Sequence, residues 1–158
     1  MDGNVPLDLA LCSESFDPLT ELQQWPHQMS NAATAIFIGR MRSQGSGAEE
    51  LEAMQLEHYP GMTERQLAKI EAEARERWQL GEVLIIHRYG ELTPGDRIVL
   101  VATTSAHRDA ALESCRFLID WLKTKAPFWK LEEVGGKTEW VEAKDADEEA
   151  AAKWNENR

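Results

Sequence analysis

The sequence has very little cysteine: two residues in 158, Cys12 and Cys115. Two thiolates cannot supply the four ligands of a structural zinc site, and no CxxC motif occurs. Counting leaves a single disulfide open, but nothing in the sequence indicates secretion. The first eleven residues contain Asp2 and Asp8 and no basic residue, which is unlike a signal peptide. We therefore expect a cytoplasmic protein with both thiols reduced.

Positive charge is also scarce. Lys and Arg number 17 against 28 Asp and Glu, which gives a formal net charge of −11. Nucleic-acid-binding domains usually carry an excess of Lys and Arg, so nucleic acid is a disfavoured partner. An acidic chain can still bind an anion if its few cations gather at one place. No apolar run reaches membrane-spanning length, so we expect no membrane partner.

The common catalytic signatures are missing as well. The sequence contains no GxGxxG, no GxxxxGK[ST], no HExxH and no GxSxG motif. Nothing therefore indicates a dinucleotide site, a P-loop, a zinc protease or a serine hydrolase. No internal repeat is present either. Any activity must rest on residues that no short motif identifies.

What is present is the composition of a folded domain, with 42% hydrophobic and 28% charged residues. Apolar runs rich in β-branched residues predict strands. These runs are 32–39, 51–58, 83–89, 97–104, 128–134 and 137–141. Turn residues at 93–96 and at Gly135–Gly136 predict two hairpins. Strands and helices alternate imperfectly, so the predicted fold class is α+β.

Two long helices are expected between the strands. Thr63 and Gln66 have the spacing of a capping box at the start of the first helix. Ser105 begins the longest helix, which runs to about Lys125 because Pro127 stops it.

The chain is predicted to have three parts. Residues 1–30 form an N-terminal extension that packs on the domain, with a short strand and a short helix near 19–25. Residues 31–145 form the main α+β domain with a hairpin subdomain, and residues 146–158 form an acidic C-terminal tail.

Several basic residues lie at the ends of the expected elements. They are Arg40, Arg42, His107, Arg108, Lys123 and Lys130. Two arginines at period two beside a Ser/Gly-rich loop suit an oxyanion, although a charged pair on an edge strand would look the same. A cationic pair in the first helical turn opposes the helix dipole, which slightly favours phosphate binding. A solvated Arg with a hydrogen-bonded His explains the pair at least as well.

The two lysines also have two readings each. Lys123 lies in the last turn of the long helix, where the dipole favours any cation, so an ordinary helix-end lysine is the simpler reading. Lys130 follows two aromatic residues and can be a lysine that extends from an apolar strand to solvent. Alternatively, apolar walls remove its solvation and make the ammonium a usable acid or base.

Longer blocks of sequence resemble a known family, the large subunit of molybdopterin synthase. The blocks are AIFIGRMR (35–42), LEHYPGMTE (56–64), HRYGELTPGD (87–96), TSAHRDAALE (104–113), DWLKTKAPFWK (120–130) and EWVEAKDAD (139–147). Their order and spacing agree with the family over most of residues 30–154. The resemblance implies a hammerhead-like α/β fold with an additional small antiparallel sheet.

The resemblance also implies a reaction. A sulfurtransferase of this kind converts a cyclic pyranopterin monophosphate to molybdopterin by adding two sulfurs. The sulfur comes from the C-terminal thiocarboxylate of a small ubiquitin-like subunit, so no cofactor is expected. Family positions for catalysis match Lys123 and Lys130. Those for substrate binding match Arg40, Met41, Arg42, His107, Arg108, Leu131, Glu132 and Lys144, the last being Arg in the family pattern.

The length of the long helix constrains such a site. His107 and Lys123 are sixteen residues apart, roughly 24 Å along a helix, which exceeds one small substrate. We therefore expect a composite pocket in a homodimer, with two small subunits completing a heterotetramer. Two other hypotheses stay open at this point: a non-catalytic dimer that only docks a ubiquitin-like tail, and a different pterin- or nucleotide-phosphate enzyme.

Overall fold

The computed structural model describes residues 9–25, 31–43, 50–141 and 145–156, which form an α+β fold with two sheets. The first sheet has the strand order β1-β4-β6-β2. Its strands are β1 (Leu9–Cys12), β4 (Val83–Arg88), β6 (Arg97–Ser105) and β2 (Ala33–Arg40). β1 runs parallel to β4, and the other neighbouring strands are antiparallel. β2 stands last in the order and is therefore an edge strand.

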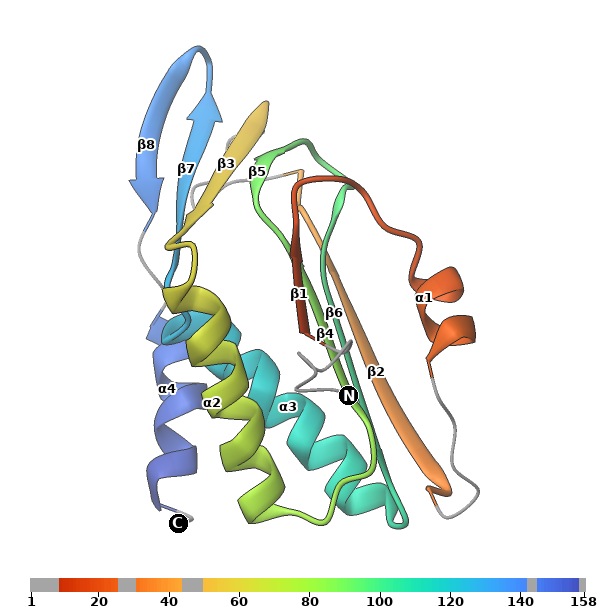
Figure 1. Cartoon of the computed structure of the whole chain (residues 1–158). Coiled ribbons are helices and arrows are strands. Elements are labelled where there is room, and N and C mark those ends of the chain that lie inside the picture. The colour runs from red at the N-terminus through yellow and green to blue at the C-terminus, as the bar shows by residue number, and fades with distance from the viewer. Residues whose placement is uncertain (1–8, 26–30, 44–49, 142–144, 157–158) are drawn as a thin grey trace.

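Helices cover both faces of the first sheet (Figure 1). α2 (Met62–Arg77) and α3 (Arg108–Thr124) enclose the main core on one face, where Leu67 and Leu118 are fully buried. On the other face, α1 (Pro18–Gln24) leads to Trp25, which packs in a second apolar cluster. In the described ranges no helix is long and apolar enough to cross a membrane.

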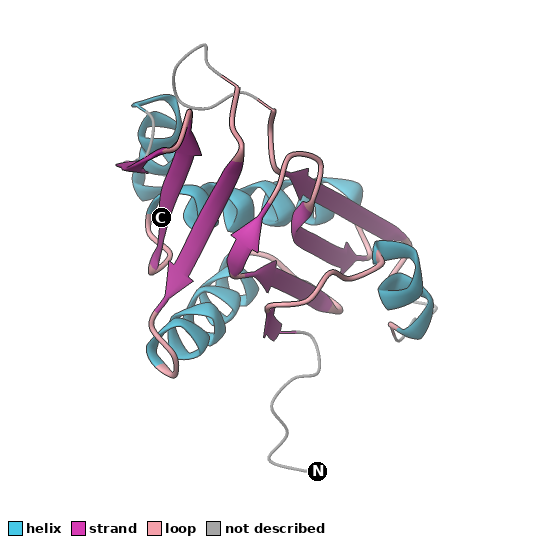
Figure 2. Cartoon of the chain, turned by 90° about the horizontal axis from the view of Figure 1, so that it is seen from above, coloured by secondary structure: helices cyan, strands magenta, loops and turns pink. Residues whose placement is uncertain are grey.

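The second sheet lies beyond the ends of α2 and α3, next to the first sheet (Figures 1 and 2). Its order is β5-β3-β7-β8, with every pair antiparallel. The strands are β5 (Gly90–Leu92), β3 (Ala53–His58), β7 (Phe128–Val134) and β8 (Lys137–Val141). Gly135 and Gly136 make the β7–β8 turn with φ of 56° and 78°, as the predicted glycine hairpin requires.

The α+β class is confirmed and the long helix is present, but the predicted start of that helix is wrong. α3 begins at Arg108, because Ser105 is still the last residue of β6 and pairs with Ala33. The capping box predicted for α2 is also wrong. The chain enters α2 through Gly61, whose φ of 84° suits glycine. The Gly61 N–H donates to the Glu64 carboxylate over 2.8 Å, so Glu64 takes the role expected of Gln66. Thr63 lies inside the helix, where its hydroxyl accepts from the Tyr59 N–H at 3.1 Å.

The predicted hairpin between β4 and β6 is confirmed as an antiparallel pair, with one difference. Gly90, with a φ of 88°, turns the chain out of the first sheet, and β5 pairs with β3 in the second sheet before the chain returns. This excursion physically joins the two sheets.

Both ends of the described chain pack on the domain. β1 belongs to the first sheet. α4 (Asp145–Glu156) lies against α3, where the Trp154 indole N–H donates to the Asp120 carboxylate over 2.7 Å.

A buried histidine interrupts the apolar face of β4. Strand alternation puts His87 on the same face of β4 as Val83 and Ile85, and His87 is 6% exposed. The ring stacks on Phe128, with centroids 4.0 Å apart and planes 16° apart. The pKa of His87 is lowered to about 4, chiefly by burial; a backbone hydrogen bond with Arg88 opposes this shift, and the charge of Lys123 adds to it. The imidazole is therefore uncharged at neutral pH.

Replacing His87 with Phe should remove one source of acid instability. An unfolded histidine titrates near pH 6.5 and His87 near 4, so between these values the unfolded chain binds more protons and stability falls as pH falls. From pH 6.5 to 4 the wild type should lose up to about 3 kcal/mol more free energy of unfolding than the variant. Urea unfolding across this range measures it, and identical pH dependence of the two proteins would contradict it.

Candidate functional site

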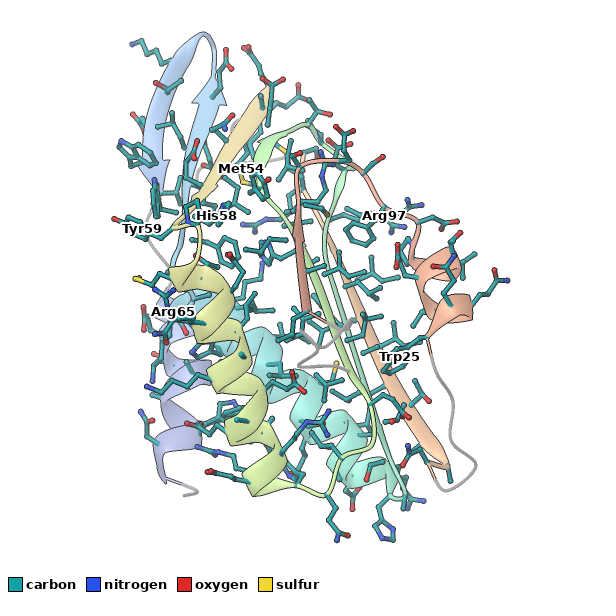
Figure 3. The ribbon with its side chains drawn as sticks, in the orientation of Figure 1. Trp25, Met54, His58, Tyr59, Arg65 and Arg97 are labelled. Atoms are coloured by element: carbon teal, nitrogen blue, oxygen red, sulfur yellow. The ribbon has the colours of Figure 1, made fainter. Side chains whose placement is uncertain are left out.

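A cavity of about 510 Å³ lies where both sheets meet the C-terminal end of α3. Residues of β2, β3, β4, β6, α3 and β7 line it, including Met54 of β3, which is labelled in Figure 3. Six of the ten expected site residues are in its wall. They are Arg40, Met41, Arg42, Lys123, Lys130 and Glu132.

Backbone hydrogen bonds fix the end of β2 at the cavity. The Met41 N–H donates to the Asp96 carbonyl over 2.8 Å, and the Gly95 N–H donates to the Met41 carbonyl over 2.9 Å. The Met41 side chain is 4% exposed and packs in the core of the second sheet. With Met41 buried, Arg40 and Arg42 on either side of it are exposed. Both guanidinium groups therefore lie at the margin of the cavity.

β7 contributes Lys130 and Glu132, two residues apart on the same side of the strand. Leu131 lies between them on the other side and does not line the cavity. Glu132 is 6% exposed, so its carboxylate is a buried acidic group in a wall that also holds cations. Of the three expected β7 residues, the structure thus brings two to the cavity.

Lys123 reaches the same cavity from α3. It lies in the last turn of the helix, where the carbonyl ends carry partial negative charge and favour a cation. The chain then passes Ala126 and enters β7, which contributes Lys130 to the wall of the same cavity. One chain therefore places both expected catalytic lysines in a single cavity.

His107 and Arg108 lie far from that cavity. His107 is the N-cap residue of α3 and Arg108 is its first helical residue, and both are exposed. α3 is continuous from Arg108 to Thr124, so it separates this pair from Lys123 by nearly its full length. Neither residue lines the cavity of its own chain. Lys144, the remaining expected residue, is outside the described residues.

His87 lines the cavity and was missed by the sequence reasoning. The run VLIIHRY reads as a buried strand, and the two-residue period of Val83, Ile85 and His87 was the available signal. A polar ring where the pattern asks for a third aliphatic side chain needs a hydrogen-bonding partner or a function.

The arrangement suits an anionic organic substrate. Arginines at the margin can bind an oxyanion, and apolar walls from Phe37, Met54 and Leu56 can hold a ring system. The lysines can donate protons to oxygens that leave the substrate. Across the described part of the chain, no group of three or more His, Cys, Asp or Glu is placed to hold a metal ion.

Comparison with known proteins identifies the family of this chain. The model of the MoaE protein family matches residues 11–125. The molybdopterin synthase catalytic subunit of Escherichia coli is 52% identical over 124 residues, which are 78% of this chain and 82% of that protein.

Solved structures agree as well. The molybdopterin biosynthesis MoaE protein from Burkholderia ambifaria superimposes with a TM-score of 0.77 at 43% identity, covering 92% of this chain and 96% of that one. A complex of subunits 1 and 2 of the molybdopterin-converting factor from Helicobacter pylori has a TM-score of 0.66, with 86% of this chain and 90% of that one covered. At 19% identity, this last likeness supports the fold alone. From its sequence, its fold and its relatives, the chain belongs to the MoaE family.

Proposed function

We propose that this chain is the catalytic subunit of a molybdopterin synthase, and that the cavity between the two sheets is its sulfur-transfer site. The observation that carries the proposal is the convergence of Lys123 and Lys130 on one cavity margined by Arg40 and Arg42. A protein that only docks a partner needs a groove but no such set of cations. The relative from Escherichia coli, at 52% identity, is named for this activity.

The proposed substrate is a cyclic pyranopterin monophosphate. Its fused rings suit the apolar walls of the cavity, and its phosphate suits the arginines at the margin. The proposed sulfur donor is a small ubiquitin-like subunit that inserts a C-terminal thiocarboxylate. The Helicobacter pylori complex of two subunits is a precedent for such an assembly. We place the reaction in the cytoplasm, where the free thiols of Cys12 and Cys115 would stay reduced.

The proposed chemistry needs no cysteine of this chain, because the partner supplies the sulfur. The thiocarboxylate sulfur attacks a side-chain carbon of the pterin, so that a C–S bond forms and a C–O bond breaks. Lys123 and Lys130 polarise the leaving oxygen and give it a proton. Water then cleaves the acyl–sulfur bond, which leaves the sulfur on the pterin and a carboxylate on the partner. A second loaded partner repeats the step.

The pocket is completed, in this proposal, by a second copy of the chain. His107 and Arg108 lie at one end of α3 and Lys123 at the other, so a phosphate held by all three requires two helices. Strand β2 spans the same distance: Ala33 pairs with Ser105 near His107, whereas Arg40 lines the cavity.

The edge position of β2 leaves it open to contact with a second copy. A two-fold axis near its middle would bring His107 and Arg108 of one copy to the cavity of the other. Ile36, in the middle of this edge strand, is an apolar residue that is 49% exposed, and the proposed contact between two copies would cover it.

Substituting Lys123 or Lys130 by Ala should reduce dithiolene formation by at least about 100-fold, because proton donation to the leaving oxygens is lost. Binding of the small subunit should remain close to that of the wild type. Single-turnover assays with the cyclic pterin and thiocarboxylated partner measure the first effect, and calorimetry measures the second.

Lys125 is the matched control for these variants. It lies two residues beyond Lys123, at the exposed C-cap of α3, and does not line the cavity. Lys125→Ala should keep the wild-type rate. Full activity in both Lys123→Ala and Lys130→Ala would leave only the docking role and refute the catalytic assignment.

Mixing a Lys123→Ala chain with a His107→Ala chain should restore activity that neither has alone. Each hybrid dimer would contain one pocket with both residues intact and one with both missing. Random pairing therefore predicts about one quarter of the wild-type rate.

The subunits should be mixed, exchanged by dilution and reassembled with the small subunit before assay. A mixture of Lys123→Ala with Lys130→Ala provides the matched control, since both residues belong to the same pocket and no hybrid would be intact. Equal activity of the two mixtures would contradict a composite pocket.

A further inference from the structure

His87 lines the cavity, and the sulfur-transfer scheme does not use its chemistry. Within the described part of the chain, its ring stacks on Phe128, its Nδ1 bonds to a backbone carbonyl, and the charge of Lys123 acts on it. A buried polar side chain costs stability unless something compensates it, so its presence on an apolar strand face calls for an explanation.

The hydrogen bond of His87 fixes its tautomer. Nδ1 lies 2.8 Å from the carbonyl oxygen of Arg88, and a carbonyl can only accept, so Nδ1 carries the proton. In a neutral imidazole the other nitrogen, Nε2, is then an acceptor with a lone pair. Stacking on Phe128 at 4.0 Å holds the plane of the ring. The chain thus presents a rigid, uncharged acceptor in the wall of the cavity.

A neutral acceptor has an advantage over a carboxylate next to a catalytic lysine. A carboxylate would orient the ammonium but also cancel much of its charge, and that charge must act on the phosphate and on leaving oxygens. An imidazole held neutral by burial can orient the ammonium and leave its charge intact. The groups around His87 fit this role. Lys123 of α3 lines the same cavity, and its charge acts on the imidazole. Phe128 of β7 stacks on the ring, and His58 of β3 contacts Phe128 in turn.

We propose that His87 is a positioning residue of the sulfur-transfer site, whose Nε2 accepts a hydrogen bond from the Lys123 ammonium and aims it at the substrate. This inference rests on the proposed function, since it assigns a partner to the lysine of that site. His87 itself does not exchange a proton with substrate. It acts through the position and the retained charge of Lys123.

Three substitutions separate the acceptor from the rest of the side chain. His87→Phe keeps the stacked ring and removes both nitrogens. His87→Asn keeps an amide near Nδ1 and loses the acceptor at Nε2, whereas His87→Gln places an amide oxygen near Nε2. Phe and Asn should lower the kcat of dithiolene formation by about 10- to 100-fold with KM for the pterin unchanged, as expected for a misplaced catalytic group. Gln should recover most of the loss.

Stability distinguishes positioning from a structural role. His87→Phe should melt no lower than the wild type at pH 7, because it replaces a buried polar ring with an apolar one. A stable but slow Phe variant therefore supports the proposal. Wild-type kcat in His87→Phe, or a Gln variant as slow as the Phe variant, would overturn it.

A spectroscopic test does not depend on sulfur transfer. Nitrogen NMR of histidine-labelled protein, assembled with its small subunit, should show His87 neutral at pH 7 with the proton on Nδ1. Lys123→Met should shift the Nε2 resonance, and Lys125→Met should leave it in place. An Nε2 resonance indifferent to Lys123→Met would refute the contact, even if the Lys123→Ala assay had already upheld the proposed function. Conversely, an active Lys123→Ala variant would refute the catalytic role while this resonance still reported the contact.

Discussion

The rigidity of α3 is the constraint on which the account of this site depends. A helix of 17 residues fixes the two ends of its cationic set, since each residue advances the chain by about 1.5 Å. Core packing of Leu118 and Cys115 against the first sheet holds the helix along its length. Lys123 therefore belongs to a cavity that His107 of the same chain does not line, so the proposed pocket that contains both residues requires a second copy.

The joining of two sheets then gives the cavity its walls. β4 passes into β5 at Gly90, and β2 ends at Arg40, directly before Met41, which packs in the core of the second sheet. The cavity lies between these two connections, and its walls need residues of both sheets. Apolar side chains from both sheets line it. Arg40 and Lys123 come from the C-terminal ends of β2 and α3, whereas Lys130 comes from within β7.

Much of this could be predicted from the sequence where local patterns decide the structure. Periodicity gave the strands and α3, and Gly135–Gly136 gave the β7–β8 turn, because these features depend on neighbouring residues. The start of α2 was misjudged because Gly61 can adopt a positive φ and Glu64 can cap it, which displaced Thr63 from the expected role. The role of β5 in the second sheet depends on long-range pairing that no local pattern encodes.

The site shows the same division. The prediction that Lys123 and Lys130 share one site came from the resemblance to a family, because the spacing of neither lysine singles it out. Leu131 does not line the cavity, although the resemblance matched it to a substrate-binding position. Sequence pattern alone does not single out His87, because a histidine within an apolar strand reads as core until the fold places it in the wall of the cavity.

The separation of the two cationic sets can be tested by a distance measurement between subunits. Spin labels would be placed at position 107 of one chain and at position 123 of the other, in a background with Cys12 and Cys115 replaced, and hybrid dimers measured by electron paramagnetic resonance. The composite pocket predicts an intersubunit distance clearly shorter than the roughly 24 Å that separates these positions along one helix. A distance well above that value, in a dimer that still binds its small subunit, would contradict it.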